Sequence, residues 1–218
     1  MINRLTLAAL GGALLLGACT HDAPVAPDTL VEAPAAPQPV TEAYTVRLFG
    51  ADIGELTATT TGANIQVDYE YRNNGRGPTM AETIILGADG LPTHWTIDGN
   101  TTFGNKVAET FALDDGTASW VDTTGPGSEP ATEPRIYIAQ NASPYALSVY
   151  AQALLADADQ TLPAWPAGAL RLEALEDVIV DGGPDPIAAT AYALTGESLD
   201  PTYFLMDGED ELFALISP

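Results

Sequence analysis

The stretch Ile65-Gln66-Val67-Asp68-Tyr69-Glu70-Tyr71-Arg72 alternates apolar and polar side chains without a break. Successive side chains of a β-strand point to opposite faces, so this pattern predicts a strand with one apolar face and one wet face. A strand of that kind suits an antiparallel sheet, which can be packed on one side and solvated on the other. This is the clearest secondary-structure element in the chain.

The same alternation continues beyond this stretch. Residues 91–97 alternate after Asp89-Gly90, and Ala118 and Trp120 follow an Asp-Asp-Gly sequence at 114–116. Asp-Gly pairs supply the positive φ angles that tight hairpins need, so these strands are expected to form an antiparallel meander. Further candidate strands cover residues 169–175, 178–180, 187–194, 203–206 and 212–216.

One helix is predicted, beginning at Ser143-Pro144. The serine side chain can cap free amides, and the fixed φ of proline suits the first helical position. One face of that helix carries Leu147, Tyr150, Ala151 and Leu154. We therefore expect a mainly β domain, an antiparallel meander forming a curved sheet or sandwich, with one α-helix packed on one side of the sheet.

The N-terminal residues are typical of an exported lipoprotein. A cation at Arg4 precedes a short apolar run, and Leu16-Gly17-Ala18-Cys19 is similar to a lipobox, which implies a cleaved signal peptide at 1–18 and an acylated Cys19. Residues 19–43, rich in alanine and proline, are expected to be a tether, and 44–218 a single β-rich domain. Thr20 favours the outer membrane, with the protein facing the periplasm and the lipid as its membrane contact.

Composition excludes several classes of function. Thirty acidic residues against seven Lys and Arg give a net charge of −23, so nucleic-acid binding is excluded. The single cysteine leaves no disulfide within one chain. With only two histidines, one of them His94 in a predicted strand, we assign no catalytic residue, no metal ligand and no cofactor. Asp122, near a Thr-Thr-Gly sequence, is interpreted as a strand-end residue that starts a turn.

Two groups of residues are candidate binding sites. The loop Asn73-Asn74-Gly75-Arg76-Gly77-Pro78 could bind an acidic group through Arg76, or it could be a tight crossing in which Arg76 pairs with a carboxylate of the same chain. A curved sheet can hold an apolar ligand, and the aromatic residues could line such a cavity or simply form the core. The candidates for that pocket are Tyr69, Tyr71, Trp95, Phe103 and Trp120, with Phe111 beside them.

Several short motifs also follow one another in an order that is similar to a known module. They are Asn73–Pro78, Asp89–Pro92, Phe103–Val107 with Glu109 and Phe111, Asp115–Trp120, Tyr150–Leu155, Leu162–Ala164 with Pro166–Gly168, Tyr192–Gly196 and Leu212–Pro218. The series resembles the N-terminal, non-barrel region of large secreted metal-dependent amidohydrolases.

The resemblance implies a membrane-anchored accessory module without catalytic residues, from a truncated or split amidohydrolase-family protein. Its partner would be an amidohydrolase barrel encoded downstream. Because the metal ligands of that family lie in the barrel, no activity is expected of this chain alone. The alternative function is a periplasmic lipoprotein that binds an apolar small molecule or lipid in a curved β-sheet.

Overall fold

The computed structural model describes residues 36–181 and 185–215. Residues from Pro37 onward form one compact unit. The predicted signal peptide, Cys19 and most of the predicted tether lie outside the described residues. Strand β1 begins at Val40, so the last residues of the range 19–43 belong to a sheet.

The first sheet is an antiparallel meander of eight strands in chain order. Its strands are β1 (Val40–Leu48), β2 (Ala51–Thr61), β3 (Asn64–Tyr71), β4 (Thr79–Leu86), β5 (Pro92–Asn100), β6 (Lys106–Asp114), β7 (Thr117–Asp122) and β8 (Gly125–Pro130). The alternating stretch is β3, where Ile65 and Val67 face the core and Gln66 and Asp68 face solvent. At the β6–β7 turn Gly116 has φ 74, the positive angle that was expected there.

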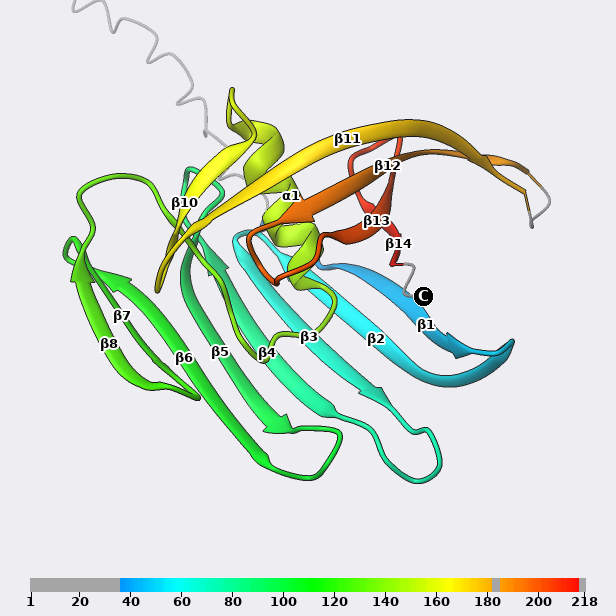
Figure 1. Ribbon diagram of the computed structural model, residues 1–218, viewed down its shortest axis with the longest axis horizontal. Coiled ribbons are helices and arrows are strands. Elements are labelled where there is room, and N and C mark those ends of the chain that lie inside the picture. Colours follow the sequence, from blue (N-terminus) through cyan, green and yellow to red (C-terminus); the bar gives the residue numbers. More distant parts are fainter. Residues whose placement is uncertain (1–35, 182–184, 216–218) are drawn as a thin grey trace, which may run out of the picture. The chain divides into compact units, whose positions relative to one another are not determined.

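The second sheet has six strands in the order β14-β13-β12-β11-β10-β9, and Figure 1 shows it as a separate layer facing the meander. Its strands are β9 (Ile136–Tyr137), β10 (Thr161–Trp165), β11 (Ala169–Val180), β12 (Ile187–Thr195), β13 (Thr202–Asp207) and β14 (Leu212–Leu215). Only the β9–β10 pair is parallel. The two candidates at 169–175 and 178–180 are one strand, β11, whose pairing with β12 shifts register between Ala174 and Asp177.

Helix α1 (Ala146–Ala156) lies between the two sheets (Figure 1). The expectation that it covers one side of a sheet was too simple, because eight of its eleven residues are buried, on almost every face. The helix begins at Ala146, three residues later than predicted, with Tyr145 as its N-cap and no side-chain cap hydrogen bond. In the turn before it the Ser143 hydroxyl accepts a hydrogen bond from the Tyr145 amide at 3.4 Å. The fold class is confirmed: the protein is mainly β with one packed helix.

Aromatic rings join the helix and both sheets into one core. Trp95 of β5 packs on Tyr150 of α1, with 5.9 Å between ring centroids. Phe111 of β6 stacks on Tyr137 at 4.5 Å and lies 5.7 Å from Trp165 of the second sheet. All five side chains are at most 2% exposed, so the interior is filled by packed rings.

Candidate functional site

Two buried carboxylates of the meander bind the segment that leads into the helix. Glu109 on β6 is 2% exposed and accepts hydrogen bonds from the Tyr137 hydroxyl (2.8 Å) and the Gln140 amide (2.8 Å). It also accepts two from Asn141, through the backbone amide at 3.0 Å and Nδ2 at 2.9 Å. Glu82 on β4 accepts from Trp95 Nε1 (2.9 Å) and the Ser143 amide (2.5 Å).

These acids have a structural role. Burial raises the pKa of Glu82, although the donors from Ser143 and Trp95 lower it in part and the charge of Glu109 raises it further.

Glu82 lies between the buried residues Met80 and Ile84 of β4, and Glu109 lies between Val107 and Phe111 of β6. This alternation is visible in the sequence and could have placed both acids in the core.

Asp122 accepts hydrogen bonds from the amide and hydroxyl of Thr124 and from Gln140 Nε2, so it is a turn residue as expected.

The five residues of the candidate aromatic pocket do not meet around one cavity. Trp95 and Trp120 are buried in the core, whereas Phe103 is 78% exposed. Tyr69 and Tyr71 are half-buried neighbours on one face of β3, with ring centroids 6.1 Å apart. Burial and the nearby Tyr71 raise the pKa of Tyr69 to about 12. The core interpretation of the buried rings is the better one.

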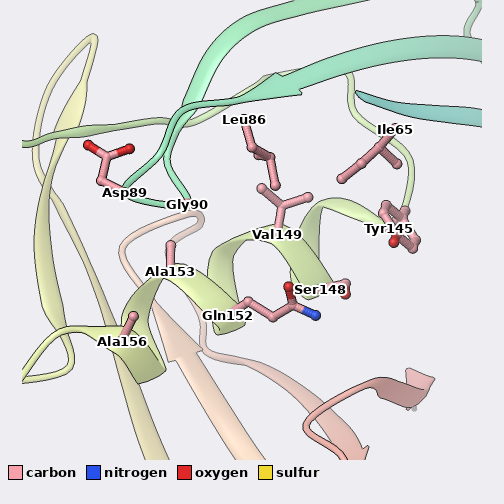
Figure 2. A pocket seen from close by; sticks show the side chains of 10 residues that line it. All are labelled: Ile65, Leu86, Asp89, Gly90, Tyr145, Ser148, Val149, Gln152, Ala153 and Ala156. Carbon is pink, nitrogen blue, oxygen red and sulfur yellow. The ribbon is translucent and has the colours of Figure 1, made fainter. Parts of the chain in front are cut away.

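A small cleft lies between α1 and the meander. Figure 2 shows Val149 of the helix pointing toward Leu86 and Ile65, while the Asp89-Gly90 turn closes one end. The cleft has a volume of about 200 Å³. Pockets for drug-sized ligands are larger, about 300–1,000 Å³, so this cleft is too small for such a ligand.

A larger hollow of about 500 Å³ lies between the β3–β4 and β5–β6 hairpin loops, and we call it the tip hollow. It is lined by Arg72, Gly75, Arg76, Gly77, Thr79, Asn100, Thr101, Thr102, Phe103 and Gly104. The fold therefore brings the candidate loop 73–78 together with Phe103 in one place. The lining by Arg72 and by residues 100–102 was not predicted, because nothing in the sequence indicates that these two loops are neighbours.

Arg72 fixes the shape of the first loop. Its Nη1 donates to three backbone carbonyls, those of Tyr71 (2.9 Å), Gly77 (3.0 Å) and Pro78 (3.0 Å). Its Nη2 donates to the Thr79 hydroxyl at 2.9 Å. Gly77 allows this close crossing, because a Cβ there would lie 1.8 Å from the Tyr71 carbonyl oxygen. A tight crossing of the chain was one of the two expectations for this loop. The contacts that hold it come from Arg72, however, and not from a pair between Arg76 and a carboxylate.

Arg76 follows a tight turn and is exposed. Its amide and carbonyl pair with those of Asn73 at 3.0 and 2.7 Å, and Asn74 (φ 52) and Gly75 (φ 74) form the corner, as an Asn-Gly turn requires. Within residues 36–181 and 185–215 the Arg76 guanidinium has neither an ion pair nor a side-chain hydrogen bond. Its donors are therefore available to an anion.

The described residues offer little for other chemistry. His94 is half-exposed, and its Nε2 lies 3.4 Å from Asp114 Oδ1. Residues 36–181 and 185–215 contain no group of three or more His, Cys, Asp or Glu that could hold a metal ion. The same part of the chain has no helix long and apolar enough to cross a membrane.

Comparisons with known proteins identify no family. No family model and no curated protein matches the sequence. A DUF1089 family protein from Pseudomonas aeruginosa is similar in structure, with a TM-score of 0.48 and 14% identity over 80% of this chain and 96% of that one. A β-barrel-like protein of the domain of unknown function DUF1849, from Brucella abortus, has a TM-score of 0.42 and 12% identity over 78% and 86%.

These findings overturn the amidohydrolase interpretation. The similar structures are proteins of other families, and no amidohydrolase is among the matches, so the accessory-module function is wrong together with the resemblance that implied it. The short motifs that suggested it are in part turn sequences such as Asp89-Gly90 and Asp115-Gly116, which recur wherever hairpins do. The alternative of an apolar ligand held inside a curved sheet is not retained, because α1 and the packed rings occupy the described interior.

Proposed function

We propose that this protein is a non-catalytic binding module whose tip hollow takes an anionic group. The observation that carries the proposal is the available guanidinium of Arg76 beside the fixed guanidinium of Arg72, in a chain with only seven Lys and Arg and a net charge of −23. A cation on so acidic a surface would be expected to pair with one of the many carboxylates. Arg76 has no such pair within the described residues.

The chemistry of the hollow suits a phosphate or a carboxylate. A guanidinium presents five N–H donors in a planar fork that matches either group. The hydroxyls of Thr101 and Thr102 and the amide of Asn100 line the same hollow and add neutral donors. Because Arg72 already holds the loop in place, little ordering is needed when an anion binds, which favours affinity.

The test is a titration of the full chain with inorganic phosphate, and separately with succinate, followed by amide shifts in ¹H–¹⁵N NMR spectra. We expect saturable shifts at residues 75–77 and 101–104, lost in Arg76→Gln and kept in Arg171→Gln. Arg171 is the matched control because it is exposed on β11, away from the hollow. No saturable shift with either anion, or equal shifts in the Arg76→Gln variant, would refute the proposal.

We also propose that the protein is anchored in the outer membrane through an acylated Cys19 and faces the periplasm. The support is the sequence Leu16-Gly17-Ala18-Cys19 after a short apolar run.

A further inference from the structure

Alternate turns of an antiparallel meander lie at one end, and at one end of this sheet three hairpin turns project beyond the shorter β7–β8 turn, as Figure 1 shows. They join β1 to β2, β3 to β4 and β5 to β6. The register places the strand ends in one row, with Gly54 opposite Tyr71 and Thr79 opposite Asn100. We call this the hairpin end of the meander; it contains the tip hollow.

Two phenylalanine rings project from this end. Phe49 in the β1–β2 turn is 100% exposed, and Phe103 in the β5–β6 turn is 78% exposed. Phe49 also has φ 49, a left-handed conformation that Gly, Asn or Asp adopts far more readily. Neither ring stabilises the fold by burial, so the folded protein alone gives no reason for a large apolar side chain at either place.

Cations gather at the same end. Four of the chain's seven Lys and Arg lie there: Arg47, Arg72, Arg76 and Lys106. Three of them face acids, at 2.6 Å (Arg47 to Asp52), 3.7 Å (Arg72 to Glu70) and 3.9 Å (Lys106 to Asp98). This end is thus nearly neutral, and the excess of negative charge lies elsewhere in the chain.

This distribution decides which end can approach a phosphate-bearing surface. At physiological ionic strength charges are screened over about 8 Å, so a lipid phosphate at the hairpin end would meet nearly balanced local charges, among which Arg76 has no ion pair within the described residues, and would hardly interact with distant acids. The remaining, acidic surface would be repelled by an anionic bilayer. Exposed rings beside arginine and lysine are the combination that binds the interfacial zone, because the rings enter it while the cations contact head groups.

We propose that the hairpin end is a membrane-contact surface, in which Phe49 and Phe103 enter the lipid interface while the tip hollow holds a lipid phosphate. The inference rests on the proposed anion-binding function and names the lipid head group as the source of the anion. Strand spacing of about 4.8 Å puts two hairpins that are four strands apart roughly 19 Å from each other. The two rings would therefore fix the orientation of the sheet on the membrane as well as its attachment.

The experiment uses the full chain with Cys19→Ser, which leaves no native thiol. Single cysteines introduced as Phe49→Cys, Phe103→Cys or Thr61→Cys are labelled with a nitroxide. Thr61 is the control, because it is an exposed residue next to the β2–β3 turn at the opposite end of the sheet. Vesicles of phosphatidylcholine with phosphatidylglycerol are added, and the collision rates of each label with oxygen and with a water-soluble nickel chelate are measured by EPR.

We expect vesicles to lower the nickel-chelate accessibility of labels at 49 and 103 several-fold, with a rise in oxygen accessibility and no change at 61. The apolar N-terminal segment is common to all variants, so local label depth, and not total binding, is the readout. Adding Arg76→Gln should reduce the protection at 103, and Phe49→Cys should leave the phosphate-induced NMR shifts intact, because Phe49 does not line the hollow.

Full water accessibility at 49 and 103 would refute the membrane proposal, and so would equal protection at 61. If the phosphate titration still succeeded in that case, the tip hollow would serve a free anion or an acidic protein, and the proposed function would stand. If the titration failed while the labels at 49 and 103 were protected, the rings would contact lipid without a phosphate site, and the proposal as stated would be wrong.

Discussion

Replacing Glu109 with glutamine should destabilise the protein strongly, although the two side chains have nearly the same shape. Glu109 is 2% exposed, and no cation is paired with it in the described part of the chain. Its charge is balanced by four donors alone, two on each carboxylate oxygen. A buried charge in this situation depends on all of its hydrogen bonds.

Glutamine keeps one acceptor oxygen and puts an NH₂ group where the other oxygen was. Whichever way the amide turns, two donors lose their acceptor. Hydrogen bonds to a charged group contribute roughly 1.5–3 kcal/mol each, so the loss should be about 3–6 kcal/mol. If the amide faces Tyr137, that hydroxyl can turn and accept, which places the loss near the lower limit.

The assay is urea unfolding followed by tryptophan fluorescence, with stability taken from the linear dependence on denaturant. Glu55→Gln is the matched control, because Glu55 is exposed on β2 and should change stability by less than about 0.5 kcal/mol. A Glu109→Gln loss below about 1 kcal/mol would contradict the argument, since it would mean that the carboxylate does not hold the segment before the helix.

Three further outcomes are expected. Burial raises the pKa of Glu82 in the folded state, so protonated Glu82 stabilises the protein fully below the unfolded pKa of about 4.3, and this stabilisation is lost as pH rises through the folded pKa. Chemical denaturation of the wild type across pH should therefore show the free energy of unfolding falling over that range. An equally steep fall in Glu82→Gln would contradict the argument. Gly127→Ala should cost about 1–3 kcal/mol and shift the fluorescence of Trp120, since the new Cβ would lie 2.3 Å from that ring, whereas Gly208→Ala meets no atom within 4 Å and should be silent. Mass spectrometry of protein from a native-like host should find a diacylglyceryl adduct on an N-terminal Cys19, and an intact signal peptide would disprove the anchor.

Strands and turns could be predicted wherever the information is local. The alternation in β3 reports its two faces directly, and the Asp-Gly turns report their positive φ angles, as at Gly116. The strands β1, β2, β4 and β6 were not singled out, although burial alternates along β1 and β6. Strands without clean alternation were missed as well. β8 carries glycine and proline at an edge of the meander, and β10 contains Pro163 yet pairs with both β9 and β11.

The candidate site was predictable in part. The loop at 73–78 could be singled out, since two glycines, a proline and a rare cation stand together there. The residues of the β5–β6 hairpin that complete the tip hollow could not be found from the sequence. Residues 100–104 become neighbours of the loop 73–78 only through the pairing of β4 with β5. For the same reason Phe103 was placed in an interior pocket, whereas it lies at an exposed turn.

By itself the sequence determined the β class, the hairpin turns, the helix and the strongly acidic charge, because each follows from residues that are close together in the chain or from composition. Only the tertiary structure decided that the helix lies between two sheets, that Glu82 and Glu109 hold the segment before it, and that the β3–β4 and β5–β6 loops line one hollow. Periodicity tells which face of a strand is apolar, but it carries no information on which distant segment covers that face. That choice is made by packing across the whole core, where contacts far apart in sequence are formed together.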